Sequence, residues 1–209
     1  MKSLFPPFDA RRFQTAGVAD AQRLPHVALE LMTVAHAPEL AQAVEAGEIW
    51  RNEFTHVPQR ADVSAYIDAA LNDALRGGAQ PFVIRWWGLP GSANTSNLVG
   101  CTRFFQFAPL HKRVQIGGTW LAACARRTGV NRAVKWLLLR EAFEVMRLQR
   151  VEFAVHPLNL QSRDAMLGIG ATYEGELRKH IHLNGAARNS AMFSILDDEW
   201  PAIKQRLLG

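Results

Sequence analysis

RVQIGGTWLAACARRTGVNRAVKWLLLREAFEVM (residues 113–146) places a strand, a basic turn and a long helix in immediate succession. Residues 113–121 are rich in β-branched and aromatic side chains, which is typical of a strand. The turn ARRTGVN, residues 125–131, joins a strand that ends at Trp120 or Leu121 to a helix that starts near Asn131. That helix has one apolar stripe, predicted to pack on a sheet and formed by Val134, Leu137, Leu138, Ala142, Val145 and Met146.

The turn is suited to binding an anion. The first N–H groups of a helix have no partner within the helix, and the helix dipole favours negative charge there, so phosphate is a natural ligand. Arg126 and Arg127 add positive charge, and Gly129 lets the backbone approach a ligand closely. An ordinary solvated loop is the alternative, because neither a GxxxxGK(S/T) nor a GxGxxG spacing occurs.

The sequence on either side of this stretch predicts further strands and helices. Strand-like composition and turn residues predict strands at 26–32, 81–87, 97–107, 150–156, 172–183 and 189–196. Helical spacing predicts helices at 36–50, at 62–78 with Asp62 as the N-cap, at 159–170 and at 197–208. Residues 1–25 show no sustained period and are expected to be an irregular lead-in, followed by one domain over 26–209. This order predicts a mixed α+β sheet.

Composition narrows the class of protein. The 209 residues suffice for one sizeable domain, and the absence of a run of about 18 apolar residues argues against a membrane span. The N-terminal apolar patch is too short for a secretory signal, so we expect a cytoplasmic protein. Cys101 and Cys124 fit no metal or redox spacing and are predicted to be buried thiols. The net charge of +5 favours a polyanionic partner or cofactor, although a mildly basic globule is the simpler interpretation.

A series of motifs, taken in order, resembles the GNAT superfamily of acyl-CoA-dependent N-acyltransferases, and within it the RimJ/RimL-type branch. R-x-x-G-x-N at Arg126, Gly129 and Asn131 resembles the family's pyrophosphate loop, Q/R-x-x-G-x-G/A. The resemblance covers about residues 26 to 208 and continues through GEIWR (47–51), VGCTRF (99–104), QIGGTWL (115–121), RVEF (150–153), NLQS (159–162), GATYEGELRKH (170–180) and FSILDDEWPAIKQRL (193–207).

The resemblance implies a GNAT fold: a mostly antiparallel central sheet, splayed at the acetyl-CoA site, with helices on both faces. It implies that the pantetheine arm lies between the strand ending near Trp120 and the strand at 150–156. The residues expected to bind acetyl-CoA are Trp120, Leu121, Arg126, Arg127, Thr128, Gly129, Val130, Asn131, Asn159 and Ser162. Asn159 and Ser162 are also the predicted catalytic residues, with the serine hydroxyl near the departing thiolate. Considered without the family, Asn159 is an ordinary helix N-cap.

The sequence departs from the family at two positions. Gln115 stands where many relatives have a glutamate that acts as general base, and Gly118 stands where an aromatic residue is common. Without a carboxylate base, an α-amine suits the site better than a lysine side chain, because it loses its proton more easily. Histidine is a fallback base. His180 and His182 share a strand face, but two ligands do not make a zinc site, and we expect no metal.

The acceptor side of the cleft is predicted at Trp50, Arg51, Phe54 and His156, although aromatic residues there could equally belong to the core. The predicted reaction is acetyl transfer to a primary amine, either a protein N-terminus, such as that of a ribosomal protein, or a small molecule. Alternatives are a CoA-binding regulatory module without catalysis and a basic RNA- or ribosome-associated protein. We expect no stable nucleic-acid complex, because no basic helix or aromatic-interleaved basic patch occurs. Dimers are common in this branch, but the sequence does not decide the oligomeric state.

Overall fold

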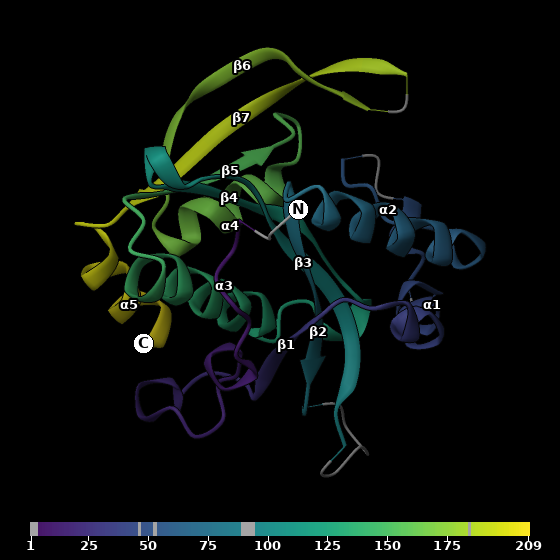
Figure 1. Cartoon of the computed structure of the whole chain (residues 1–209), viewed down its shortest axis with the longest axis horizontal. Helices are drawn as coiled ribbons and strands as arrows, with labels where there is room; N and C mark the ends of the chain where they lie inside the picture. The colour runs from purple at the N-terminus through teal and green to yellow at the C-terminus, as the bar shows by residue number, and fades with distance from the viewer. Residues whose placement is uncertain (1–3, 46, 52–53, 89–94, 184) are drawn as a thin grey trace.

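The computed structural model describes residues 4–45, 47–51, 54–88, 95–183 and 185–209, and seven strands in this part of the chain form one sheet (Figure 1). The strand order is β1-β2-β3-β4-β5-β7-β6, and every neighbouring pair is antiparallel except β4 and β5. This confirms the predicted α+β class with a mostly antiparallel sheet. The strands are β1 Val27–Leu31, β2 Ala79–Trp86, β3 Asn97–Ala108, β4 Arg113–Leu121, β5 Arg150–Val155, β6 Thr172–Leu183 and β7 Ala186–Leu196.

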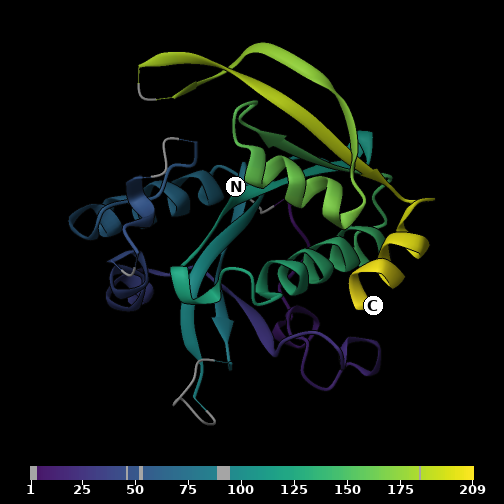
Figure 2. The same ribbon diagram turned by 180° about the vertical axis from the view of Figure 1, so that it is seen from behind.

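Five α-helices in the described residues cover the two faces of the sheet (Figures 1 and 2). The first two pack on each other and on β2 and β3, and the other three form a second group in which the last helix contacts both of its predecessors. The helices are α1 Ala37–Glu45, α2 Val63–Leu75, α3 Val130–Arg140, α4 Leu160–Ile169 and α5 Trp200–Leu208. None of them is long and apolar enough to cross a membrane.

The parallel pair β4 and β5 stays together only briefly. Residues 113–115 pair with residues 150–152, and the ladder stops at Gln115 and Glu152. Beyond that point β4 continues for six residues along β3, while β5 continues along β7. The two strands therefore diverge towards their C-terminal ends, as the resemblance implied, and leave unpaired backbone groups facing each other across the gap.

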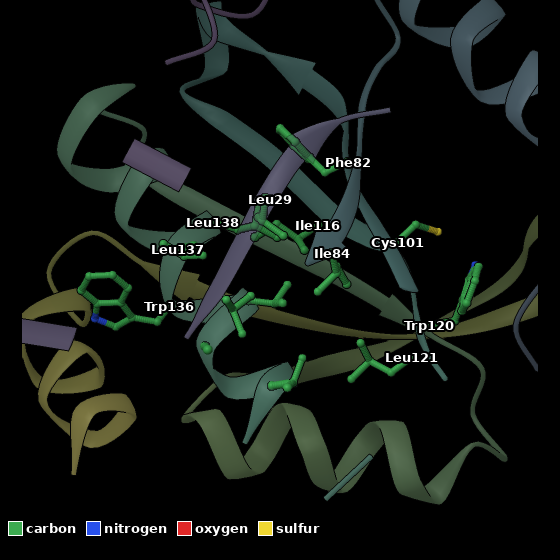
Figure 3. Close-up of a cluster of buried hydrophobic side chains, with 14 of the residues drawn as sticks. Leu29, Phe82, Ile84, Cys101, Ile116, Trp120, Leu121, Trp136, Leu137 and Leu138 are labelled. Atoms are coloured by element: carbon green, nitrogen blue, oxygen red, sulfur yellow. The ribbon is translucent and has the colours of Figure 1, made fainter. Parts of the chain in front are cut away.

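The helix α3 fixes this divergence by packing beneath it. Leu137 and Leu138 are fully buried and point towards Leu29 and Ile116 on the sheet (Figure 3). Burial of one such leucine contributes about 1.5–3 kcal/mol. Trp136, also fully buried, points away from this group (Figure 3). A helix held on several sides in this way positions its first turn rigidly beside the end of β4.

The lead-in is not a loose segment. Phe5 and Phe13 are buried in the main hydrophobic core, and Gln14 forms a β-bridge with Ala28. Arg12 reaches Glu141, a carboxylate residue that is only 2% exposed, with a distance of 3.0 Å between Nη2 and Oε1. These contacts are non-local, which is why the local sequence pattern did not reveal them.

Four local predictions were wrong. The helix expected over 131–146 changes to a π turn at Glu141–Val145, so the apolar stripe loses its register and Val145 is 42% exposed. Asp62 precedes α2, but its side chain makes no cap hydrogen bond, because a 3₁₀ turn at Arg60–Asp62 leads directly into the helix. Cys124 is exposed rather than buried, since it lies in a 3₁₀ turn after β4.

The helix expected over 36–50 is also shorter than predicted. Its α-helical part ends at Glu45, and Ile49–Arg51 forms a separate 3₁₀ turn. Gly47, which lies between these two segments, has a φ of +82°, a conformation that favours glycine. Ala46, which lies within this predicted helix, is outside the described residues. The other strands and helices fall within about three residues of the predicted positions.

Candidate active site

A hollow of about 400 Å³ lies between the end of β4, the start of α3 and one face of α4. We call it the arginine hollow, because Arg126, Arg127 and Arg132 line it together with Gly129 and Asn131. In the part of the chain that the structure describes, no aspartate or glutamate lines it. Three guanidinium groups without a carboxylate in one concave site are suited to phosphate groups.

The backbone at the start of α3 completes this site. Gly129 is the N-cap, with a φ of +86° and no side chain to cap the helix. The Val130 N–H donates to Thr128 Oγ1 (3.5 Å), and the N–H groups that follow it in the first turn are the donors that a helix start offers to a ligand. Thr128 Oγ1 donates to the carbonyl of Ala125 (2.7 Å) and closes the turn. Val130 is fully buried, so its side chain anchors the turn to the core. These features fit the diphosphate of a nucleotide cofactor.

The arginines differ in how they are held. Arg126 Nε donates to the carbonyl of Leu121 (3.1 Å), which folds this side chain back over the end of β4. Arg127 has a φ of +60°, a region that non-glycine residues seldom adopt. Trp120 and Leu121, the other predicted residues at this end of β4, also line the hollow.

A second hollow of about 280 Å³ lies where β4 and β5 diverge. We call it the hairpin hollow, because His180 and Arg188 from the β6–β7 hairpin form one wall. Phe54 forms part of the opposite wall, and Arg188 Nη1 donates to its carbonyl (2.9 Å). The hairpin arches over this part of the sheet (Figure 1). An acceptor molecule entering the cleft would meet this hollow.

Of the four residues predicted on the acceptor side, two line the hairpin hollow and two do not. Phe54 and His156 line the hairpin hollow, with ring centroids 4.8 Å apart. Trp50 and Arg51 lie outside both hollows: Trp50 packs against the core, and Arg51 stacks over its ring and pairs with Glu48 (3.0 Å).

The two hollows adjoin, and five side chains line both. The most unusual is Lys135, which projects from α3 and is 3% exposed. Its Nζ donates to Thr119 Oγ1 (3.0 Å) and lies 5.6 Å from the centroid of the Phe153 ring. No carboxylate in the described residues pairs with it, and burial lowers the pKa of Lys135 to about 7. The five shared residues are Thr55, Thr119, Lys135, Ser162 and Met166.

Asn159 and Ser162 stand at the start of α4, beside the gap. Asn159 is buried, and its Oδ1 accepts the N–H of Ser162 (3.0 Å), so the asparagine is the N-cap of α4. This structural role leaves the amide nitrogen of Asn159 as a donor towards the hairpin hollow, which Asn159 lines. Ser162 lies between the two hollows.

His156 is oriented as a donor rather than a base. Its Nδ1 accepts the N–H of Leu158 (3.1 Å), so the proton of the neutral ring is on Nε2. Burial lowers the pKa of His156, and the charge of Arg188 adds to this effect, while Glu176 opposes it. The ring is therefore neutral near pH 7 and lacks a free lone pair for proton abstraction.

Gln115 occupies the apex of the divergence. It is the last residue of β4 that pairs with β5, is 1% exposed and lines the hairpin hollow. Neither Oε1 nor Nε2 of its amide has a hydrogen-bond partner in the described part of the chain. Because buried amides are seldom left unpaired, this group is suited to bonding a ligand.

Sequence reasoning missed three residues of the cleft. Arg132 lies in the first turn of α3, and its place beside a predicted phosphate site was a usable signal. Lys135 interrupts an apolar stripe, which also happens when a lysine extends its ammonium group to water. Arg188 is 134 residues from Phe54 in the chain, so no local pattern could place it in the cleft. In the described residues no group of three His, Cys, Asp or Glu side chains could hold a metal ion.

Comparison with known proteins agrees with this geometry. A family model described as "Acetyltransferase (GNAT) domain" matches residues 26–172. The "Putative ribosomal N-acetyltransferase YdaF" of Bacillus subtilis is 25% identical over 182 residues, which cover 86% of this chain and 96% of that protein. A GCN5-related N-acetyltransferase from Brucella melitensis is 25% identical, with a TM-score of 0.76 over 88% of this chain and 82% of that chain. RimJ of Mycobacterium smegmatis, solved with CoA-disulfide, shares the fold at 22% identity, with a TM-score of 0.71 over 88% of each chain.

Proposed function

The chain belongs to the GNAT acetyltransferase family, and from that premise we propose that it transfers the acetyl group of acetyl-CoA to an α-amine, either a protein N-terminus or a small molecule. It is an acetyl-CoA-dependent N-acetyltransferase. The observation that carries the proposal is the divergence of β4 and β5, which opens directly onto two adjoining hollows of different character.

The arginine hollow fits the phosphates of CoA. Arg126, Arg127 and Arg132 supply charge without a competing carboxylate, and the first turn of α3 supplies N–H donors. The unpaired backbone of β4 past Gln115 can pair with the amides of an extended arm in the manner of an added strand. Bound there, acetyl-CoA supplies its acetyl group as an activated thioester.

The junction of the hollows is then the place of reaction. Asn159 can donate its amide N–H to the cofactor, and Ser162 can donate its hydroxyl proton towards the departing sulfur. Backbone N–H groups at the end of β4, around Trp120, can stabilise negative charge on the thioester oxygen. Lys135 adds an amine at the same place, which is positive when it is protonated and has a pKa of about 7.

The hairpin hollow limits the choice of amine. Among the described residues no carboxylate lines it, and the Nδ1 atom of His156 is occupied, so neither a carboxylate of this part of the chain nor His156 serves as the base that deprotonates the acceptor. At pH 7 removal of a proton costs about 1.4 kcal/mol for an α-amine and about 4.6 kcal/mol for a lysine amine. The difference corresponds to a preference of about 200-fold for the α-amine. Since the name of YdaF refers to the ribosome, the N-terminus of a ribosomal protein is one candidate acceptor.

Acetylation of two matched peptides tests the proposed acceptor class. One peptide offers only a free N-terminus, and the other has a blocked N-terminus and one lysine. We expect kcat/KM with acetyl-CoA to be about 100-fold or more higher for the free N-terminus. Equal rates, or a faster reaction at lysine, would overturn the α-amine assignment.

The cofactor site is tested by isothermal titration with CoA. A charge-assisted bond contributes about 1.5–3 kcal/mol, so Arg126→Gln or Arg127→Gln is expected to weaken CoA binding about 10- to 100-fold. Arg76→Gln is the matched control, because Arg76 lies at the exposed end of α2 and outside both hollows. Unchanged affinity in both arginine variants would show that this turn does not hold the phosphates.

A further inference from the structure

The hairpin hollow is electrostatically one-sided. Its charged lining residues are Lys135 at the junction and Arg188 on β7, and three histidines accompany them, His56, His156 and His180. Among the described residues, no aspartate or glutamate lines it. Glu176, on the adjacent strand β6, accepts a hydrogen bond from Asn189 (2.6 Å) and lines a neighbouring depression together with Glu152 and Glu174. That depression shares Gln106 and His180 with the hairpin hollow. Any acceptor in this hollow therefore faces positive charge and hydrogen-bond donors.

Most of the buried polar side-chain atoms without a hydrogen-bond partner in the described residues belong to residues that line this hollow. In the described part of the chain, six buried side-chain nitrogen or oxygen atoms have no hydrogen-bond partner, and four of them belong to residues that line this hollow. They are Nε2 and Oε1 of Gln115, Nδ1 of His180 and Nε of Arg188. A buried polar group without a partner costs about 1–3 kcal/mol. The concentration of such atoms in one place indicates that a polar ligand completes their hydrogen bonds.

Arg188 is the strongest of these groups. Its Nη1 donates to the carbonyl of Phe54 (2.9 Å), which fixes the guanidinium across the hollow, and no carboxylate of the described residues pairs with it. Burial lowers the pKa of Arg188, although a guanidinium stays charged in proteins. Arg150, by contrast, pairs with Glu152 and Glu174 at the closed end of the sheet. Described carboxylates therefore pair with Arg150, whereas none of them pairs with Arg188.

We infer that the amine acceptor carries a carboxylate, and that Arg188 binds this carboxylate in the hairpin hollow. The inference rests on the proposed function, because it assigns the hairpin hollow to the acceptor. Gln115 and His180 are the additional groups available to polar atoms of the acceptor. Acidic N-terminal peptides fit this description, whereas polyamines and basic peptides do not.

Three amidated tetrapeptides with free N-termini provide the test: Ser-Glu-Glu-Ala, Ser-Gln-Gln-Ala and Ser-Arg-Arg-Ala. Glutamate and glutamine differ in charge but hardly in shape. One charge-assisted bond predicts that kcat/KM is about 10- to 100-fold higher for the glutamate peptide than for the glutamine peptide, with the arginine peptide slowest. The N-acetylated forms of the same peptides cannot react, so their binding by calorimetry, with and without CoA, measures the preference separately from turnover.

Variants of Arg188 connect the preference to this side chain. Arg188→Gln is expected to reduce the advantage of the glutamate peptide to about twofold or less, and Arg188→Lys is expected to retain part of it. Arg178→Gln is the matched control, since it removes an exposed positive charge from the same hairpin outside the hollow, and it should keep the full preference. Thermal unfolding of each variant verifies that the fold is intact.

The outcomes separate this inference from the proposed function. Equal use of the glutamate and glutamine peptides, a preference for the arginine peptide, or a glutamate preference that persists in Arg188→Gln would overturn the inference. Failure to bind any acetylated peptide would overturn it as well. If the protein bound no CoA and acetylated no peptide, the proposed function would fail, while the binding measured without CoA would still decide whether Arg188 selects a carboxylate.

Discussion

Replacement of Lys135 by methionine should stabilise the fold, by an amount that depends on pH. Burial without a carboxylate partner lowers the pKa of Lys135 from an ordinary value of 10.5 to about 7. Below pH 7 the ammonium is charged in both folded and unfolded chains, and its full desolvation cost opposes folding. Above pH 10.5 it is neutral in both, and the cost disappears. Between these values the unfolded chain binds more protons, so stability rises with pH.

The size of the effect follows from the two pKa values of Lys135. The cost to the fold is about 4 kcal/mol at pH 7 and about 2 kcal/mol at pH 9. Lys135→Met removes it, so the variant is expected to exceed the wild type in free energy of unfolding by about 4 kcal/mol at pH 7, with a difference about 2 kcal/mol smaller at pH 9. Methionine has a similar length and suits an apolar site, so packing is retained.

Urea denaturation of wild type and Lys135→Met at several pH values between 7 and 9 measures this difference. Lys112→Met is the control, because Lys112 is exposed and its replacement should show no comparable slope. A difference between wild type and Lys135→Met that stays constant from pH 7 to 9, or a variant less stable than wild type, would refute the reasoning. Acetylation by the more stable variant should be slower, since the positive group at the junction of the hollows is lost.

Three further substitutions test individual contacts. Arg12→Met leaves the buried carboxylate of Glu141 without its partner and should cost about 3 kcal/mol in urea denaturation, while adding Glu141→Gln should recover part of the loss. Gly129→Ala forces a side chain onto a φ of +86°, with its Cβ 3.2 Å from Pro25 Cγ, and should lower stability by about 1–2 kcal/mol and weaken CoA binding in calorimetry. Asn159→Ala removes the N-cap of α4 and should cost about 1 kcal/mol, whereas Asn159→Asp should keep the cap and, if the amide N–H serves the cofactor, weaken CoA binding alone.

The fold was predictable from the sequence where structure is local. Strands rich in β-branched residues and separated by turns appear close to their predicted positions, and α3 begins at Val130, one residue before the predicted start. The π turn after α3 was not predictable, because a change from i+4 to i+5 hydrogen bonding leaves no mark on apolar spacing. The burial of Phe5 and Phe13 depends on contacts with strands far along the chain.

In the site, too, local features were predictable from the sequence and features formed by distant segments were not. The turn from Arg126 to Asn131 was recognisable, because a helix start, a glycine and two arginines lie together in the sequence. The hairpin hollow was not, because β5, β7 and the segment around Phe54 meet only in the folded chain. The identity of Gln115 could be read directly, but its isolation could not, since burial and lack of partners are properties of the packed structure.

Folding brings positively charged side chains that are scattered in the sequence together in two hollows. The arginines are scattered in the sequence, and a net charge of +5 by itself suggested polyanionic partners in general. In the structure Arg126, Arg127 and Arg132 line one hollow, and Lys135 and Arg188 line the next. None of the described residues that line either hollow carries a carboxylate. These hollows, of about 400 and 280 Å³, are of the size of small-molecule sites. Charge enclosed in this way acts on a nucleotide cofactor and a small anionic acceptor, whereas RNA binding needs a charged surface open along the length of a strand.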